Sequence, residues 1–215
     1  MRKINTVLFD FDGTLMDTNS VIIESWRHMF RMMGVKEKPV EEIVKTLGEP
    51  LTLTMKNLFP GMDISEPVSI YRDFHRENYE ESIKLFPGMG ELVISLKEKG
   101  YKLGLVTSRM AWSTMLGLEK YKLKEYFDAI VTADDTDKHK PDPEPVNITL
   151  GKLGSKPEES ILIGDTRFDV LCAGNAGVKS VLVAWSIALS EEERTGEYAP
   201  DYIINTAEEL LQILN

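Results

Sequence analysis

Short apolar runs alternate with amphipathic segments along most of the chain. The runs are TVLFDF, KLGLVTS, AIVTA, SILIGD and SVLVAW, which are rich in Val, Ile and Leu, and most of them end in Asp, Ser, Thr or Gly. Short, almost wholly apolar runs are typical of strands in a parallel sheet that is covered on both faces. We therefore expect these runs to be strands of one buried sheet.

The segments between these runs have the pattern of helices. They are GELVISLKEKG, TMLGLEKYKLKEY, EPVNITLGKLG and FDVLCAGNAG, and several of them end in a glycine of the C-cap type. Strands that alternate with helices form right-handed βαβ units. The pattern therefore predicts an α/β fold with a doubly wound, Rossmann-like parallel sheet.

One interval breaks this alternation. From about Asn19 to Leu85 no run is typical of a strand, and SVIIESWRHMFRMMG and VSIYRDFHRENYEESI are amphipathic helical segments. We expect an inserted all-helical subdomain over residues 19–85, and a core domain made of residues 1–18 and 86–215. A stripe at helical spacing should pack between the inserted helices, and its members are Trp26, Met29, Phe30 and Met33.

Charge and cysteine content narrow the class of protein. The chain has 215 residues, with 25 Lys and Arg against 35 Asp and Glu, and a formal net charge of −10. Such an acidic chain is unsuited to electrostatic binding of nucleic acid or anionic membranes. No apolar run approaches the roughly 20 residues of a membrane-spanning helix. The single cysteine, Cys172, can form no internal disulfide, so we expect a cytoplasmic protein. The apolar content permits a monomer, which is the state we expect.

Two carboxylates stand one residue apart where the first apolar run ends. Residues two apart on an extended chain point the same way, about 7 Å from each other, so Asp10 and Asp12 share one face. Their repulsion disfavours both charged forms unless a cation or a shared proton offsets it. The pair therefore suggests a metal site.

Other strand ends carry oxygen ligands as well. Thr107 and Ser108 follow the second run, and Asp165 follows the run SILIG. Ligands of open α/β sheets bind at the carboxyl ends of the strands, so these side chains should face one crevice. Mg²⁺ prefers such oxygen ligands. The three histidines, His28, His75 and His139, are scattered and form no zinc-type cluster with cysteine.

Two further features suit a phosphoryl substrate. Lys140 lies in KHKPDPEP, where three prolines can hold its ammonium at a fixed place. A fixed cation would offset the charge that develops on oxygen during group transfer. Gly13 and Thr14 allow a tight turn after the two aspartates, and free backbone N–H groups there could cradle phosphate oxygens.

Four motifs in order along the chain resemble one known family. DFDGT at residues 10–14, VTS at 106–108, the lysine of HKPDPEP and GDTRFD at 164–169 resemble the haloacid dehalogenase superfamily of aspartate-nucleophile phosphohydrolases. The helical insertion directly after DFDGT is similar to that family's first-position cap. The resemblance therefore implies an enzyme with this cap over residues 19–85.

The resemblance implies a role for each motif residue. Asp10 would be the nucleophile that forms an aspartyl phosphate. Asp12 would protonate the leaving group and then activate water, and its backbone carbonyl would bind Mg²⁺. Asp165 would be a further metal ligand, and Asp169 would orient the metal's waters or Lys140. Thr107 and Lys140 would contact the phosphoryl group. In this picture the two carboxylates tolerate each other because Asp10 binds Mg²⁺ while Asp12 can carry a proton.

A finer resemblance is to the bacillus-type inorganic pyrophosphatases of the superfamily. The segments DTNSVIIES, LGEPL, YRDF, KPDPEP, AWSI and PDYII carry it, and Asn19 and Trp185 favour it most. Phosphoglycolate phosphatase shares DFDGT and KPDPEP, so a phosphatase of small phosphomonoesters is the alternative. A β-phosphoglucomutase-like phosphoryl transferase has the same motifs. A non-catalytic metabolite-binding protein on the same scaffold is the alternative from another class.

Substrate contacts are expected from two more places. Arg109, in VTSR, stands where the pyrophosphatases have a lysine, and it is a candidate contact for a second phosphate, together with Ser108 beside it. Gly48 and Glu49 lie in LGEPL, which would cover the crevice when the cap closes. The same turn could equally be a plain connector between helices. We expect pyrophosphate or a small phosphorylated metabolite as the substrate.

Overall fold

A six-stranded parallel sheet forms the centre of the computed structural model, which describes residues 3–190 and 194–214. The strand order is β5-β4-β1-β6-β7-β8, and every pair of neighbours is parallel. The strands are β1 (Thr6–Phe9), β4 (Lys102–Val106), β5 (Ala129–Val131), β6 (Ser160–Gly164), β7 (Lys179–Val183) and β8 (Tyr202–Ile204). The predicted parallel α/β sheet is confirmed. The sequence analysis did not include β8, whose short run has two exposed residues.

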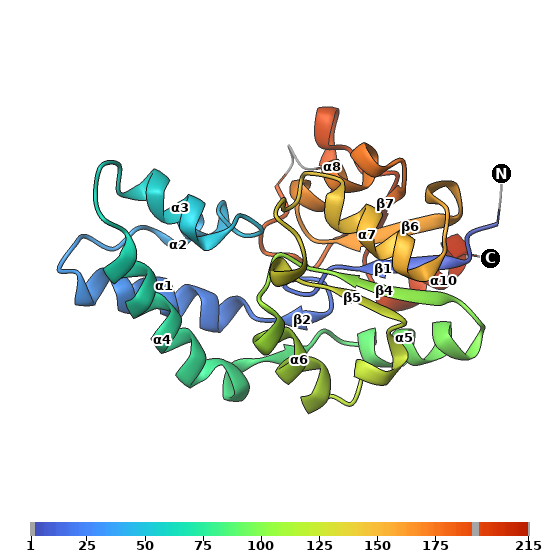
Figure 1. Cartoon of the computed structure of the whole chain (residues 1–215), viewed down its shortest axis with the longest axis horizontal. Helices are drawn as coiled ribbons and strands as arrows, with labels where there is room; N and C mark the ends of the chain where they lie inside the picture. Colours follow the sequence, from blue (N-terminus) through green and yellow to red (C-terminus); the bar gives the residue numbers. More distant parts are fainter. Residues whose placement is uncertain (1–2, 191–193, 215) are drawn as a thin grey trace.

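Helices cover both faces of this sheet (Figure 1). Val7 and Phe9 of β1 belong to one buried cluster, and Leu8 between them belongs to another, as the alternation of side chains along a strand requires. The first cluster includes α5 (Met89–Glu98), α6 (Ala111–Lys120) and α10 (Ala207–Leu214); the second includes α7 (Glu144–Leu153) and α8 (Arg167–Ala176). The sheet is therefore the middle layer of three.

The predicted helix over TMLGLEKYKLKEY ends earlier than expected. Lys122 takes a left-handed backbone conformation with φ of 55°, which an α-helix cannot continue through. The chain resumes as the short helix η1 (Lys124–Tyr126). The glycine stops predicted after α7 and α8 are confirmed, because Gly154 and Gly177 both adopt positive φ. The other short helices are η2 (Ala133–Asp135), η3 (Pro157–Glu159) and η4 (Gly196–Tyr198).

The inserted segment forms a helical group beside the sheet, at the end away from both chain termini (Figure 1). Its helices are α1 (Asn19–Met32), α2 (Val40–Val44), α3 (Leu51–Leu58) and α4 (Ser65–Ser82). They have a hydrophobic cluster of their own, in which Trp26, Met29 and Phe30 are buried and against which Met33 packs. The predicted packing stripe is thereby confirmed.

A two-stranded antiparallel pair joins the ends of this insertion. β2 (Met16–Asp17) pairs with β3 (Lys84–Leu85), so the expectation that no strand lies between Asn19 and Leu85 was wrong at its last two residues. Strands of two residues carry no detectable pattern. We still propose domain boundaries between residues 18 and 19 and between residues 85 and 86. These boundaries leave β2 in the core domain and β3 in the insertion. Within the described ranges, no helix has both the length and the apolar character to cross a bilayer.

Candidate active site

The strand-end residues meet where the order of the strands reverses. From the central β1 the chain builds β4 and β5 on one side and then β6, β7 and β8 on the other, which opens a crevice at the carboxyl edge. Asp10 directly follows β1, Thr107 follows β4 and Asp165 follows β6. All three side chains border one cavity.

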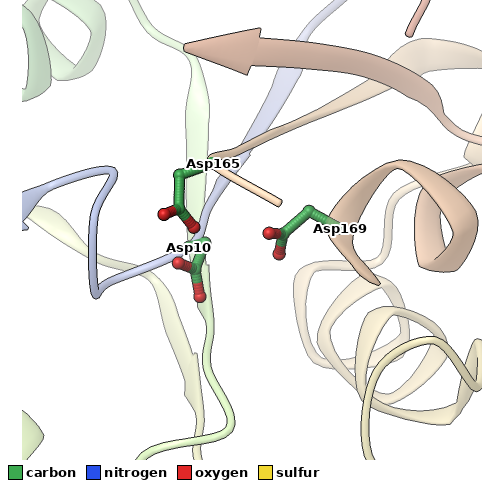
Figure 2. A group of neighbouring side chains, drawn as sticks. All are labelled: Asp10, Asp165 and Asp169. Atoms are coloured by element: carbon green, nitrogen blue, oxygen red, sulfur yellow. The ribbon is translucent and has the colours of Figure 1, made fainter. Parts of the chain in front are cut away.

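Three buried carboxylates converge in this crevice. One oxygen each of Asp10, Asp165 and Asp169 lies within 4.8 Å of the others, and Figure 2 shows the three groups pointing toward a common centre. Two glycines make room for them. A Cβ atom on Gly13 would lie 2.0 Å from Asp165 Oδ2, and one on Gly164 would lie 2.2 Å from the Asp169 Cβ.

Lys140 lies against two of these carboxylates. Its Nζ donates to Asp10 Oδ1 at 2.5 Å, to Asp169 Oδ1 at 2.6 Å and to the Val106 carbonyl at 3.3 Å. The other oxygen of Asp169 accepts from the Thr166 backbone and hydroxyl, in a capping box at the start of α8. Asp169 is therefore held on both sides, in a geometry that suits orienting Lys140.

The carboxylates carry more negative charge than Lys140 balances. Burial raises the pKa of Asp10 to about 7, with Lys140 opposing the shift and Asp169 adding to it. Burial, followed by the charges of Asp10 and Asp169, also raises the pKa of Asp165, although Ser186 Oγ donates to its Oδ2 at 3.0 Å. A buried, all-oxygen set with surplus negative charge fits a hard divalent cation.

Asp12 is paired differently from the expectation. Arg109 Nε lies 2.8 and 3.0 Å from the two Asp12 oxygens, Arg109 Nη2 lies 2.8 Å from Oδ1, and the Thr18 hydroxyl donates to Oδ1 at 2.6 Å. Burial acts to raise the pKa of Asp12, but the Arg109 guanidinium, with smaller contributions from Thr18 and His75, lowers it below its ordinary value. The expected proton on Asp12 is therefore wrong for this arrangement, because an arginine neutralises the carboxylate.

The third nitrogen of Arg109 contacts a histidine of the insertion. Arg109 Nη1 lies 3.0 Å from His75 Nε2, and His75 Nδ1 lies 3.3 Å from Ser25 Oγ, whose own hydroxyl donates to Val21 O at 2.5 Å. Because the arginine must donate, His75 is neutral with its proton on Nδ1. Burial, and then the charge of Arg109, lowers the pKa of His75 to about 3.

The turn after the aspartates is less open than predicted. The Gly13 N–H donates to Met16 O at 2.8 Å, so it is not a free donor for phosphate, and this part of the predicted cradle was wrong. Gly13 instead provides the space that Asp165 occupies. Thr14 Oγ1 and Ser108 Oγ are buried without a hydrogen-bond partner, whereas Thr107 Oγ1 accepts from the backbone N–H two residues ahead at 3.1 Å.

The LGEPL turn lies against the core domain. Gly48 has φ of 88°, and a Cβ there would lie 2.9 Å from Phe168 Cδ2 and 3.1 Å from Thr166 Oγ1. Glu49 Oε2 accepts from Thr54 Oγ1 at 3.0 Å. Both Gly48 and Glu49 border the cavity, which holds about 350 Å³ and is also lined by Asp10. The turn thus covers the crevice in this structure.

The two residues that favoured the finer resemblance lie in different surroundings. Asn19 borders the cavity. Trp185 packs against Phe86, with their ring centroids 5.9 Å apart, at the edge of the main core. Trp185 therefore contributes to core packing and does not line the cavity.

Sequence reasoning missed several residues of the site. Ser186 follows β7 and could have been found by the same strand-end rule that found Asp165. His75 was set aside as one of three scattered histidines, and only the placement of α4 brings it to Arg109. Further cavity residues that were not assigned include Tyr71, Arg72, Arg76 and Trp112.

Comparisons with known proteins agree with this geometry. The family described as "Haloacid dehalogenase-like hydrolase" matches residues 7–183. Pyrophosphatase PpaX of Halalkalibacterium halodurans is 37% identical over 212 residues, covering 99% of this chain and 97% of that protein. A solved haloacid dehalogenase-like family hydrolase from Streptococcus pneumoniae superposes with a TM-score of 0.88 at 27% identity, covering all of both chains. A solved protein from Clostridium acetobutylicum, described as "a predicted phosphatase", gives 0.86 at 28% identity over 99% of both chains.

Proposed function

The chain belongs to the haloacid dehalogenase-like hydrolases, and from that membership we propose that it is a Mg²⁺-dependent inorganic pyrophosphatase acting through an aspartyl phosphate. The buried group of Asp10, Asp165 and Asp169 with Lys140 carries the proposal. The likeness to Pyrophosphatase PpaX over nearly the whole chain supports the choice of substrate. We propose that it acts in the cytoplasm, as a monomer.

Asp10 is the proposed nucleophile. Its carboxylate oxygen would attack one phosphorus of pyrophosphate, forming a phosphorus–oxygen bond to Asp10 while the bridging bond breaks and inorganic phosphate leaves. Lys140 holds the attacking carboxylate in place and offsets charge on the transferred group. Ser108 borders the same cavity, and its hydroxyl, which has no partner among the described residues, is a potential donor to the transferred group.

Asp12 would act in the second half of the reaction. As a carboxylate it can take a proton from the water that attacks the phosphorylated Asp10, which releases the second phosphate. Arg109 and Thr18 occupy its oxygens in this structure. A phosphate is a much less basic leaving group than an alkoxide and departs more easily without being protonated, which favours pyrophosphate over an alkyl phosphate.

The residues present fit a divalent cation. Asp10 and Asp165 would hold it with their carboxylates, Asp12 would add its backbone carbonyl, and Asp169 would orient its waters. Mg²⁺ bound there supplies Lewis-acid polarisation of the phosphoryl oxygens. The raised pKa values of Asp10 and Asp165 support this assignment, because a cation would stabilise the charged carboxylates that burial and the neighbouring negative charges disfavour.

One observation favours a second candidate substrate. The cavity holds about 350 Å³ and is lined partly by aromatic side chains, among them Trp26, Tyr71 and Trp112. Pyrophosphate needs neither that volume nor those rings. A small phosphomonoester such as phosphoglycolate is therefore the alternative, with the same Asp10 chemistry.

Release of inorganic phosphate with Mg²⁺ tests the proposal. Pyrophosphate, phosphoglycolate and several sugar phosphates are compared on one preparation. We expect kcat/KM for pyrophosphate to exceed the others by about a hundredfold, which is some 2.7 kcal/mol of differential transition-state binding. Preference for an organic phosphate would refute pyrophosphate as the substrate, but it would leave the proposed role of Asp10 as the nucleophile unaffected.

Asp10→Asn should abolish turnover while the circular dichroism spectrum stays unchanged. Near-normal rates in that variant would refute the mechanism.

A further inference from the structure

Two arginines at the cavity have no acidic partner among the residues that the structure describes. Arg72 and Arg76 lie one turn apart on α4, and both border the cavity that contains Asp10. Among the residues that the structure describes, neither forms an ion pair. The arginines of α1 behave differently, since Arg27 pairs with Glu24 at 2.8 Å and Arg31 pairs with Glu37 at 3.3 Å. The unpaired arginines of the insertion thus face the cavity.

The other cations of the cavity are already engaged. Lys140 lies between Asp10 and Asp169, and all three nitrogens of Arg109 contact Asp12 or His75. Arg109 is therefore not free to receive a second phosphate in this arrangement. In a chain with a formal net charge of −10, unpaired positive charge at a cavity favours an anion there.

A tryptophan of the core domain holds one of these arginines. The Arg76 guanidinium carbon lies 5.6 Å from the ring centroid of Trp112, at the start of α6. Trp112 packs edge-on against Tyr79, with centroids 6.0 Å apart, and is 37% exposed at the cavity. Stacking on a ring keeps a guanidinium extended and its N–H edges free. Arg76 is thereby positioned before any ligand arrives.

We propose that Arg72 and Arg76 form a subsite for a second anionic group of the substrate, the one that is not transferred, and that Trp112 positions Arg76 within it. The subsite takes phosphates that carry a further phosphate or a carboxylate. This proposal rests on the proposed function. It assigns the distal phosphate of pyrophosphate to Arg72 and Arg76 in place of Arg109. His75, between them on α4, contacts Arg109 and so places this helix face next to Asp12.

The test compares substrates with and without a second anionic group. The variants are Arg72→Ala, Arg76→Ala and Trp112→Ala, with Arg31→Ala as the control that removes a cap arginine outside the cavity. The probes are pyrophosphate, phosphoglycolate and phenyl phosphate, whose tail is neutral. We expect Arg76→Ala to lower the ratio of kcat/KM for pyrophosphate over phenyl phosphate by about tenfold, mainly through KM, as loss of one charge-assisted contact predicts.

Two comparisons separate a positioning role for Trp112 from a structural one. Trp112→Phe keeps an aromatic face and should recover most of the ratio that Trp112→Ala loses. Trp112→Ala added to Arg76→Ala should cost little more than Arg76→Ala alone, because the two residues act as a unit. Additive losses, or equal losses in Trp112→Phe and Trp112→Ala, would overturn the positioning role.

The outcomes distinguish this proposal from the proposed function. If Arg72→Ala and Arg76→Ala weaken all three substrates equally, or no more than Arg31→Ala does, the subsite is refuted even when pyrophosphate is the best substrate. If the wild-type protein fails to hydrolyse pyrophosphate and the arginine variants selectively lose phosphoglycolate relative to phenyl phosphate, the subsite stands and the pyrophosphatase proposal fails.

Discussion

At the scale of single residues, the candidate site depends on the absence of a Cβ atom at Gly13. Gly13 has φ of 76°, and a Cβ there would lie 2.0 Å from Asp165 Oδ2. The glycine therefore serves the backbone turn and the carboxylate at the same time. Only the space for Asp165 concerns the proposed metal site. Comparing a substitution at Gly13 with one at another glycine of positive φ therefore separates the two effects.

Gly13→Ala should weaken Mg²⁺ binding and kcat/KM by about ten- to a hundredfold, because displacing a metal ligand or its support has effects of that size. Gly100→Ala is the matched control, since Gly100 has φ of 83° and no atom within 4 Å of an added Cβ. Both variants should lose about 1 kcal/mol of unfolding free energy to the positive φ. Calorimetric titration with Mg²⁺ and steady-state rates measure the difference; equal Mg²⁺ affinities in the two variants would contradict this role for Gly13.

At the scale of elements, α4 links the insertion to the carboxyl edge of the sheet. Tyr71, His75 and Tyr79 are spaced one turn apart and are buried toward Arg109, whose guanidinium carbon lies 4.7 Å from the Tyr79 ring centroid. His75 is the member that bonds to Arg109 and, on its other side, to Ser25 of α1. One helix face thus brings α1 and the loop after β4 together.

This arrangement makes stability depend on pH in a defined direction. Burial, with the charge of Arg109, lowers the pKa of His75 to about 3, while Asp12 opposes the shift. As pH falls below the ordinary value of about 6.5, the unfolded chain takes up this proton before the folded one does. The unfolding free energy should therefore decrease as the pH is lowered from about 6.5 to about 3, by up to about 1.4 kcal/mol per pH unit for this group.

Urea unfolding at a series of pH values measures this slope. His75→Gln keeps an acceptor for Arg109 and removes the titrating group, so its unfolding free energy should vary less with pH than that of the wild type. An identical slope in the two proteins would show that His75 takes up no extra proton on unfolding. The tyrosines of the same face remain uncharged across this range, because burial raises the pKa of both Tyr71 and Tyr79.

At the scale of the whole molecule, the cavity is lined by residues from two parts that have separate hydrophobic clusters, the insertion and the sheet with its helices. The inserted helices pack around Trp26 and Met29, and the sheet has its own clusters on its two faces. The charged groups of the cavity come from both parts, with Asp10 and Lys140 from the core and Arg72 and Arg76 from the insertion. We therefore expect a cation bound by the buried carboxylates at the carboxyl edge of the sheet to stabilise the folded state.

Mg²⁺ should raise the melting temperature. At free Mg²⁺ of a hundred times its Kd the folded state gains about 2.7 kcal/mol, which is about 5 to 10 °C for a chain of this length. Asp165→Asn should lose most of that increase, whereas Asp137→Asn, at an exposed position outside the cavity, should retain it. Differential scanning calorimetry with Mg²⁺ and with EDTA gives the shifts; the same increase in both variants would place the cation elsewhere.

Local patterns were enough for most of the sheet and for the ligands at its edge. The apolar runs marked five of the six strands, and Asp10, Thr107 and Asp165 follow three of them directly. Parallel strands bring their carboxyl ends to one edge, so residues far apart in the sequence could be assigned to one crevice without knowing any contact. β2 and β3 have two residues each, which show no periodicity, and β8 has two exposed residues among its three, so none of them forms a buried apolar run.

The sequence by itself determined the fold class, the helical insertion, the family resemblance and the acidic strand ends, because each is encoded by runs of neighbouring residues. Only the tertiary structure decided which charges meet. Arg109 pairs with Asp12, 97 positions away, and contacts His75, 34 positions away. The first pair is set by the pairing of β1 with β4, and the second by how α4 lies over the edge of the sheet; no local spacing carries that information. The same physical reason explains why Arg72 and Arg76 became candidates only once the cavity was seen.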